Sequence, residues 1–425
     1  MVASAEAETR AAELPKISAS DRGSVARVRA WLGNSDYAAS ATKALMLGTA
    51  DGEPQSDIAR TNPVVKLFLG GETVATEFRD DFLDCGTIDA LSRVGLVREE
   101  AGRLHPLVRI APFNGLFIVS DREWVADSCA KPDYVRGLTG DTAWLANLSV
   151  RAEVDRTLDL CTGTGVLALL AARHSRRVVA TDVNPRALAF AKLNSILNGI
   201  DNIEILEGDR FEPVAGERFD LISCKAPSAP APIGSCIDSD GVRNESVESL
   251  VKTVPSYLEV GGYAQILCSS LRSAEDQWTR LVARWLKDSG CNAWVACGRS
   301  GPAGERAEQS PSGCDAADGK RLGGDEFGQD RERRTVSVDT GLITMRRSER
   351  SRNWVRVDSN LPQAFADAGA YVARCFWLQD FLDSVPGFEL LNEIVYLSPS
   401  VELEQTSVPS SAGWKLKRCE LRMTR

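Results

Sequence analysis

The segment Thr157–Ala168 most constrains how this chain of 425 residues can fold. It reads Thr-Leu-Asp-Leu-Cys-Thr-Gly-Thr-Gly-Val-Leu-Ala, in which an apolar run enters a glycine turn and then an Ala/Leu-rich stretch. Gly163 and Gly165 allow a tight turn and a close approach of the backbone to a ligand. The small Ala168 lets the following helix pack against the strand. The segment therefore predicts a strand, a turn that binds a nucleotide-like ligand, and a helix.

Further apolar runs follow, and polar residues stand where they end. Val178–Asp182 ends in an acid ~20 residues after the turn, where a carboxylate binds ribose hydroxyls in such folds. Ile203–Asp209 ends in a second acid, and Phe219–Cys224 is followed by Lys225. Ligands of open α/β sheets lie beyond the carboxyl ends of the strands. One crevice is therefore expected to be lined by Asp159, Gly163, Asp182, Asp209 and Lys225.

The order and spacing of these motifs resemble those of class I S-adenosylmethionine-dependent methyltransferases. Within that class, Thr181–Asn194 with Asn198-Gly199 is similar to the methyltransferase small-domain group, which includes release-factor glutamine and ribosomal RNA guanine methyltransferases. The resemblance covers residues 126–297. It implies an α/β fold with a Rossmann-like class I methyltransferase sheet and S-adenosyl-L-methionine as cofactor. The implied reaction transfers a methyl group to a nitrogen or oxygen of a small molecule or a protein side chain.

The resemblance also implies which residues contact the cofactor. Asp159 and the glycine turn are expected to hold its methionine end, Asp182 its ribose, and Asp209 with Arg210 the adenine edge. The segment Val135–Leu145, before the first strand, is similar to the entry segment of this group, which closes over the methionine end of the cofactor. It also fits an ordinary helix capped by Asp141 or Thr142. The full set of predicted cofactor contacts is Gly140, Thr142, Asp159, Cys161, Gly163, Gly165, Asp182, Val183, Asn184, Asp209 and Arg210.

The sequence departs from that group at the end of the fourth strand. The group has Asn-Pro-Pro followed by Tyr or Phe, whereas this chain has Lys225-Ala-Pro-Ser. The Asn oxygen accepts a hydrogen bond from an amino group of the methyl acceptor, but a Lys ammonium only donates. Lys225 and Pro227 are nevertheless the predicted catalytic residues. Three interpretations stay open: a nitrogen methyltransferase that uses backbone carbonyls, an oxygen methyltransferase with Lys225 beside the acceptor, or a protein with reduced catalysis.

Two other function classes compete with a methyltransferase. An NAD(P)-dependent Rossmann oxidoreductase is one, because Gly-x-Gly-x-x-Ala followed by an acid is also a dinucleotide fingerprint. The acid at Asp209, the position of the motif behind another domain and the missing Tyr-x-x-x-Lys weigh against it. A winged-helix regulator with a non-catalytic cofactor-binding domain is the other, and it would explain Lys225-Ala-Pro-Ser as decay.

Composition suggests how the chain divides. Residues 1–20 are expected to be disordered, and residues 21–125 to form an N-terminal helical, winged-helix-like domain that recognises the substrate. The methyltransferase domain is expected to comprise residues 126–298 and 341–425. Residues 299–340, rich in Gly, Ser, Asp, Glu and Arg, read as a disordered insertion.

The N-terminal region shows helical patterns followed by extended ones. Helices are expected over Val25–Leu32, Pro63–Leu69, Val74–Leu83 and Ile88–Leu96, and extended segments over Leu104–Ile110 and Leu116–Ser120. Near the C-terminus, Tyr371–Leu382 reads as a helix and Leu390–Leu397 as a strand. The C-terminal region is thus expected to complete the same sheet.

Charge and composition narrow the partners and the chemistry. The net charge of −9 argues against an electrostatic grip on nucleic acid, which leaves a small-molecule or protein acceptor. No apolar run approaches the ~18 residues of a membrane span, and the expected location is cytoplasmic. The eleven cysteines contain no Cys-x-x-Cys pair and the chain has two histidines, so no metal is expected. The sequence gives no account of oligomeric state.

Overall fold

The chain forms two compact units, Met1–Ala373 and Arg374–Arg425, and each is considered by itself. The computed structural model describes residues 16, 18–34, 37–47, 62–76, 83–122, 133–226, 239–273, 278–297, 301–302, 336–348, 353–358, 368–385, 401–410 and 413–423.

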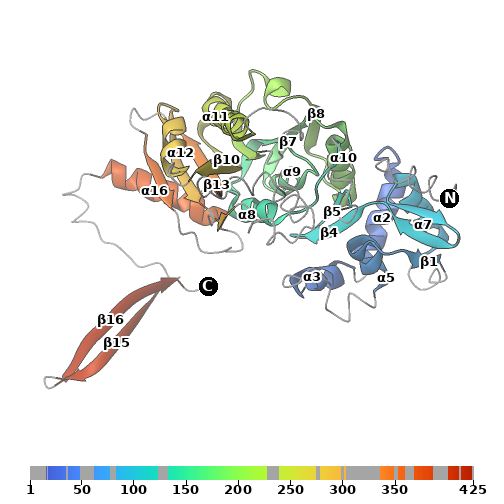
Figure 1. Ribbon diagram of the computed structural model, residues 1–425, viewed down its shortest axis with the longest axis horizontal. Helices are drawn as coiled ribbons and strands as arrows, with labels where there is room; N and C mark the ends of the chain where they lie inside the picture. Colours follow the sequence, from blue (N-terminus) through green and yellow to red (C-terminus); the bar gives the residue numbers. More distant parts are fainter. Residues whose placement is uncertain are drawn as a thin grey trace. The chain divides into compact units, whose positions relative to one another are not determined.

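A nine-stranded sheet forms the centre of the first unit (Figure 1). Its strand order is β14-β11-β13-β10-β9-β6-β7-β8, with β12 paired to β13. Strands β8, β7, β6, β9 and β10 are parallel neighbours, whereas β13 runs antiparallel to both β10 and β11. The bounds are β6 Val154–Leu160, β7 Ser175–Asp182, β8 Ile203–Glu207, β9 Phe219–Lys225, β10 Leu258–Ser273, β11 Cys291–Cys297, β12 Gly301–Pro302, β13 Val336–Arg347 and β14 Val355–Asp358.

The strand order reverses direction at one place in this sheet. From β6 the chain adds β7 and β8 on one side, and then returns to add β9 on the other side of β6. Such a switch point opens a crevice at the carboxyl ends of the two strands, because their connections leave in opposite directions. The predicted class I methyltransferase sheet is confirmed by this parallel, doubly wound arrangement.

Helices join and cover the strands. They are α8 Gly140–Leu148, α9 Val166–Ala171, α10 Pro185–Asn198, the short 3-10 helix η4 Glu212–Val214, α11 Ser239–Tyr257 and α12 Trp278–Leu286. The local sequence explains the limits of α10. The Asn184 side chain accepts from the Arg186 N–H, Pro185 takes the first helical position, and Gly199 ends the helix at φ 67°. Buried apolar residues of α11, α12 and strands β6, β9, β10, β11 and β13 form one core, including Leu158, Ile222 and Val254.

The N-terminal module, Arg22–Pro106, combines helices with a small sheet. It contains α2 Arg22–Asn34, α3 Tyr37–Leu47, α5 Pro63–Val65, the π-helical turn η1 Lys66–Gly70, β1 Val74–Ala75, α7 Cys85–Val94, β2 Val97–Glu100 and β3 Arg103–Pro106. The sheet order is β1-β3-β2, and Ala101 and Gly102 turn the chain between β2 and β3 with positive φ. The module is mainly helical, as expected from the sequence, and the winged-helix-like assignment stays a prediction.

Three local predictions in this module were wrong or incomplete. Val74–Leu83 was expected to be helical, but Val74–Ala75 pairs with β3, and residues 77–82 lie outside the described part. Strand β2 was missed because only its first residue is buried, which removes the alternating pattern of a strand. The single extended segment expected over Leu104–Ile110 is split between β3 and β4 (Arg109–Phe113).

Strand β5 (Leu116–Ser120), the hairpin partner of β4, docks on α10 through two asparagine side chains. Asn194 exchanges hydrogen bonds with the backbone N–H and C=O of Val119 at 2.9 and 3.0 Å. Asn198 does the same with Phe117, both at 2.9 Å. Four residues along a helix advance ~6 Å and two along a strand ~6.6 Å, so these spacings match. The two amides therefore act as hydrogen-bonding partners for this strand.

The N-terminal module also shares a hydrophobic core with α10. Val25, Val28 and Leu32 of α2 belong to the same buried cluster as Phe190 and Leu193 of α10. Figure 1 shows α2 beside α10. A movement of the whole module as a lid would have to separate this core.

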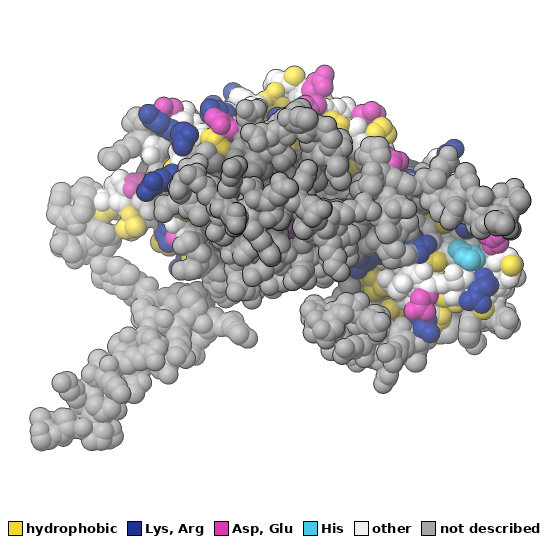
Figure 2. All heavy atoms as spheres, in the orientation of Figure 1, with side chains coloured by type: hydrophobic (Ala, Val, Ile, Leu, Met, Phe, Trp, Pro, Cys, Tyr) yellow, Lys and Arg dark blue, Asp and Glu magenta, His cyan; other side chains and the backbone are white. Residues whose placement is uncertain are grey.

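Charges on the N-terminal module are mixed in sign. On strands β2 and β3, Arg98 and Arg103 stand on either side of Glu99 and Glu100 in the sequence. On the face shown in Figure 2, the described basic and acidic side chains of the module are interspersed rather than gathered by sign.

The end of the chain differs from the expected domain limits. Helix α16 (Gly369–Ser384) fits the predicted helix, and β13 and β14 join the large sheet as expected. In contrast, β15 (Val401–Ser410) and β16 (Gly413–Met423) form a two-stranded sheet of their own in the second unit. β12 and the start of β13 fall within residues 299–340, which were predicted to be a disordered insertion. Both pair in the large sheet, so these parts of the range are ordered. The strand expected over Leu390–Leu397 lies outside the described residues.

Candidate functional site

The candidate site lies where the parallel strands end, here called the carboxyl edge. The glycine turn, Cys161–Gly165, follows β6, and Lys225 is the last residue of β9. Leu160 and Cys224 are register partners, so the glycine turn and Lys225 leave neighbouring strands at the same level. On the other side of β6, β7 ends at Asp182. The predicted site residues at the strand ends are thus brought together around the switch point.

Asp159 holds the glycine turn from behind. Its side chain is fully buried and accepts hydrogen bonds from the hydroxyls of Ser223 and Thr162, both at 2.6 Å, and from the Ala168 N–H at 3.2 Å. Burial raises its pKa to about 6, although these hydrogen bonds act in the opposite direction. Asp159 has no exposed surface, so the structure gives it a positioning role where the sequence suggested direct contact with the methionine end.

The two glycines of the turn both have positive φ, but a side chain would meet different surroundings at each. Gly163 has φ 55° and Gly165 has φ 81°, a region that other residues rarely adopt. A Cβ at Gly165 would lie 3.1 Å from the Cβ of Ala191 on α10. A Cβ at Gly163 would meet no heavy atom within 4 Å. Gly165 therefore permits close packing of the turn on α10, whereas Gly163 borders open space.

Asp182 connects the end of β7 to the glycine turn and to α10. One carboxylate oxygen accepts from the Gly163 N–H and the other from the Asn184 N–H, both at 2.9 Å. A carboxylate has about four lone-pair positions, so Asp182 keeps acceptor capacity for further donors. Its side chain is only half-buried. Asn184 in turn caps α10, which makes its predicted cofactor contact secondary to a role in fixing Asp182.

Lys225 is tied to the segment that precedes the first strand. Its Nζ donates to Thr139 Oγ1 at 2.8 Å and to Thr142 Oγ1 at 3.1 Å. Thr139 also caps α8 by accepting from the Thr142 N–H. The prediction of Asp141 or Thr142 as the cap was therefore wrong, because α8 begins earlier, at Gly140. Thr139 itself was missed, although Thr-x-x-Thr at a helix start is a readable signal.

The remaining predicted contacts lie at the β7 and β8 end of the crevice. The Val183 side chain is 61% exposed. Arg210 has positive φ, and its carbonyl accepts from the Thr181 hydroxyl at 3.1 Å. Asp209 is exposed and lies 3.5 Å from the Arg210 guanidinium. Pro227, the second predicted catalytic residue, lies outside the described residues.

Cys161 and Cys224 lie side by side beneath the turn. The hydrogen bond with Cys161, followed by burial, raises the pKa of the Cys224 thiol well above its ordinary value. A thiol in that state stays protonated and is a poor nucleophile. Cys161 has φ 54° and starts the turn, so its predicted place beside the cofactor is compatible with the structure, and Cys224 serves as a packing residue.

Two sets of residues that support the site were not recognised from the sequence. Arg186 in α10 pairs with Asp121 in a buried, two-pronged ion pair, and Asp121 also accepts from the Val135 N–H at 2.9 Å. Asn194 donates to the Thr164 carbonyl at 2.9 Å, which links the glycine turn to α10. Both contacts join residues that are far apart in the chain, so no local sequence pattern predicts them.

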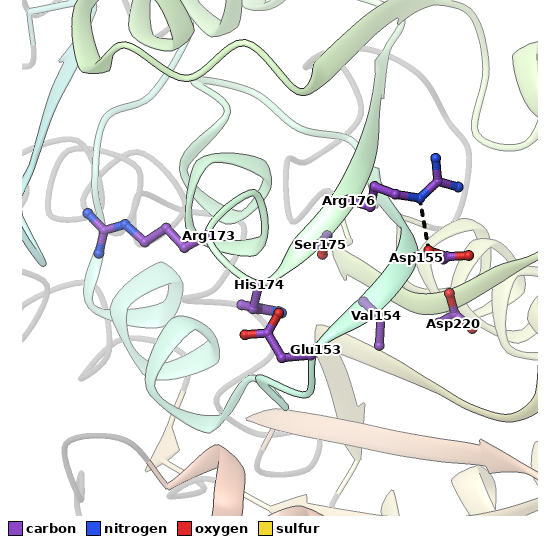
Figure 3. A pocket seen from close by; sticks show the side chains of 8 residues that line it. All are labelled: Glu153, Val154, Asp155, Arg173, His174, Ser175, Arg176 and Asp220. Carbon is purple, nitrogen blue, oxygen red and sulfur yellow. Dashed lines mark hydrogen bonds and ion pairs between the residues drawn. The ribbon is translucent and has the colours of Figure 1, made fainter.

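A charged hollow lies at the opposite, amino edge of the sheet (Figure 3). It encloses about 630 Å³ where β6 and β7 begin. Arg176 pairs with Asp155 at 2.9 Å, and both side chains are about 70% exposed. In Figure 3, Arg173 points away from the other side chains. The residues that line the hollow are Glu153, Val154, Asp155, Arg173, His174, Ser175, Arg176 and Asp220.

The carboxyl edge fits the cofactor that the sequence implied, S-adenosyl-L-methionine. Open space in front of Gly163 leaves room for a ligand against the backbone. Asp182 offers acceptors for ribose hydroxyls, and exposed Val183 offers an apolar surface for a base. Lys225 provides a cation at the other end of the crevice.

Two further properties concern only the described residues. Within them, no helix has both the length and the apolar character needed to cross a membrane. In the same part of the chain, no group of three or more His, Cys, Asp or Glu side chains is arranged to hold a metal ion.

Comparison with protein families gives one match. Residues 139–283 match the family model of the methyltransferase small domain. The matched region begins at Thr139 and contains the glycine turn, Asp182 and Lys225. The family resemblance inferred from the sequence is thereby confirmed.

Several curated relatives of this region are named as methyltransferases of protein glutamine. A protein of Methanocaldococcus jannaschii, named for protein N5-glutamine methylation, is 35% identical over 133 residues, 29% of this chain and 66% of the relative. The release factor glutamine methyltransferase of Deinococcus radiodurans is 40% identical over 96 residues, which are 21% of this chain and 34% of the relative. The ribosomal protein uL3 glutamine methyltransferase of Bradyrhizobium diazoefficiens is 42% identical over 81 residues, which are 18% of this chain and 25% of the relative. The chain thus spans less than two thirds of the length of each.

The solved structure of the ribosomal protein L11 methylase of Lactobacillus delbrueckii subsp. bulgaricus aligns with a TM-score of 0.31 at 18% identity, over 51% of this chain and 83% of that chain. The fold assignment rests on the strand order described above.

Proposed function

We propose that this protein is an S-adenosylmethionine-dependent methyltransferase that modifies a protein side chain. The observation that carries the proposal is the glycine turn held between Asp159 and Asp182 at the switch point, next to Lys225. The family match over residues 139–283 supports the same class of enzyme. The dehydrogenase and regulator alternatives gain no support from the comparisons.

In this proposal, each part of the carboxyl edge contributes a different contact. Asp182 holds the ribose, Val183 packs on the base, and Gly163 lets the backbone approach the ligand. Asp159 positions the turn without touching the cofactor. The other proposed cofactor contacts are Gly140, Thr142, Cys161, Gly165, Asn184, Asp209 and Arg210.

The bound cofactor would supply a methyl group carried on a positively charged sulfur. The chain's own contribution is to orient donor and acceptor, which can supply ~7–11 kcal/mol of the barrier without any acid–base step. The end of β9 is the proposed acceptor side of the crevice. Because strands β6 and β9 are neighbours, that side adjoins the glycine turn.

A protein acceptor is favoured by the names of the relatives, which act on release factors and ribosomal protein uL3. Mixed charges on the N-terminal module and the net charge of −9 give nucleic acid no electrostatic advantage. The N-terminal module, fixed on α10, is the proposed recognition element for the protein substrate.

Methyl transfer to defined proteins tests this proposal. Purified release factor and uL3 are incubated with the enzyme and methyl-labelled cofactor, and the label is located by peptide mass spectrometry. We expect label on a side-chain amide nitrogen, which resists mild base, whereas a methyl ester would be released. Asp182→Asn should abolish labelling, and Asp155→Asn, at the amino edge, should not. An enzyme that binds cofactor but labels neither protein would contradict the proposed substrate class.

A further inference from the structure

Lys225 occupies an unusual electrostatic position. Its ammonium donates to two hydroxyls, Thr139 Oγ1 and Thr142 Oγ1, which lie 3.0 Å from each other. Both threonines belong to the first turn or cap of α8, and a helix start carries partial positive charge. A cation beside that end raises the local positive potential. The cluster Thr139–Thr142–Lys225 is therefore suited to an anion.

The order of strands indicates which anion would reach this cluster. Asp182 lies at the end of β7, the glycine turn follows β6, and Lys225 lies at the end of β9. Neighbouring strands are ~4.8 Å apart, so a ligand with its ribose at Asp182 crosses the turn and reaches β9 after about 10 Å. If the ribose lies at Asp182 and the methionine end at the glycine turn, as the sequence resemblance implies, the carboxylate of the amino-acid end would lie toward β9.

We propose that Lys225, with Thr139 and Thr142, binds the carboxylate of the cofactor's amino-acid end. This inference rests on the proposed function and deepens it, because it assigns Lys225 to the cofactor and not to the methyl acceptor. The two hydroxyls hold the ammonium in place, and each can rotate to donate to a carboxylate oxygen.

The assignment has a consequence for the acceptor. An ammonium engaged with the cofactor's carboxylate does not repel a neutral amide nitrogen, nor does it compete for the hydrogens of that amide. Replacement of Asn by Lys at this position is thus compatible with transfer to nitrogen.

Two ligands that differ only at the amino-acid end test the inference. S-adenosylhomocysteine carries the carboxylate, whereas 5′-methylthioadenosine has the same nucleoside and sulfur without it. Binding of both is measured by calorimetry for the wild-type protein, Lys225→Met, Lys225→Arg and Thr142→Val. Lys252→Met, an exposed lysine on α11 paired with Glu248, is the matched control.

We expect Lys225→Met to weaken S-adenosylhomocysteine binding about 10- to 100-fold and to change methylthioadenosine binding less than about twofold. Lys225→Arg should keep most of the affinity, and Lys252→Met all of it. Raising NaCl from about 50 to about 500 mM should weaken binding of S-adenosylhomocysteine to the wild-type protein but not that of methylthioadenosine. This salt comparison needs no variant and holds even if Lys225→Met does not fold.

Equal losses for both ligands, or no loss for either, would overturn the inference. In the second case S-adenosylhomocysteine still binds, so the proposed function stands and Lys225 belongs to the acceptor side. A wild-type protein that binds neither ligand overturns the proposed function together with this inference.

Discussion

The two edges of the large sheet both carry charged side chains, but they hold them differently. At the carboxyl edge, Asp159 and Asp182 accept hydrogen bonds from backbone N–H groups and hydroxyls at fixed positions. At the amino edge, Arg176 and Asp155 meet in solvent, each about 70% exposed. The amino edge also carries a hollow of about 630 Å³. The comparison shows that a candidate binding site is distinguished by carboxylates fixed through several hydrogen bonds to the backbone and to hydroxyls, and not by the presence of charged side chains alone.

The largest expected effect comes from breaking the ion pair that supports the carboxyl edge. Asp121 is 1% exposed at its side chain and binds both Arg186 and the Val135 N–H. Asp121→Ala removes the carboxylate that pairs with the buried Arg186 charge, and should lower the free energy of unfolding by about 3–5 kcal/mol. Urea denaturation measures this change. A loss below about 1 kcal/mol would mean that the pair behaves like the exposed one at the amino edge.

The next effect concerns the pH dependence of stability through Asp159. Its pKa in the folded protein, about 6, is raised above its ordinary value of 3.8, so the folded state disfavours the charged form. The contribution of Asp159 to stability is fully present below about pH 4 and is lost as pH rises through about 6. The expected loss is ~3 kcal/mol.

Asp159→Asn separates this titration from all others, because the amide does not ionise. The difference in unfolding free energy between the wild-type protein and Asp159→Asn should shift toward the variant by ~3 kcal/mol between about pH 4 and about pH 8. Urea denaturation across this range checks it. A difference that stays constant with pH would contradict a pKa of the Asp159 carboxyl that burial raises to about 6.

The paired glycines sharpen the comparison within the carboxyl edge itself. Gly165→Ala adds a methyl group against Ala191 and a strained φ, so stability should fall by about 2–4 kcal/mol. Gly163→Ala meets only open space, so stability should fall by about 1 kcal/mol. Its methyl group would occupy the ligand's side of the turn, and S-adenosylhomocysteine affinity should fall more than about tenfold. Thermal melts and calorimetry separate the two outcomes, and equal behaviour of both variants would contradict the described roles.

The smallest effect is expected at the amino edge. Asp155→Asn removes an exposed ion pair with Arg176 and should change the unfolding free energy by less than about 0.5 kcal/mol. S-adenosylhomocysteine affinity should not change, because the residue lies at the opposite end of β6 from the glycine turn. A clear loss of affinity in calorimetry would give the amino edge a part in the site.

The sequence predicted those elements that depend on local residue patterns. The apolar runs within β7 and β9, Val178–Ala180 and Leu221-Ile222, are buried, as expected for strands covered on both faces, and the glycine turn followed from residue type. Strand β2 escaped because it is exposed along most of its length, and β1 because two residues give no periodicity.

The partners of the site residues were the part that the sequence did not reveal. Ser223 binds Asp159 across 64 positions, and Arg186 binds Asp121 across 65. Such contacts depend on which strands become neighbours, and that is decided by the whole fold. Asn194 and Asn198 were visible as two amides on one helix face, but the strand that they bind was not.

Calorimetric binding of S-adenosylhomocysteine and of NADH tests the central claim most directly, with Asp182→Asn and Asp155→Asn as matched carboxylate variants at the two edges. We predict that S-adenosylhomocysteine binds, that NADH does not, and that affinity is lost in Asp182→Asn but retained in Asp155→Asn. Binding of NADH, or affinity that survives in Asp182→Asn, would contradict a methyltransferase cofactor site at the carboxyl edge.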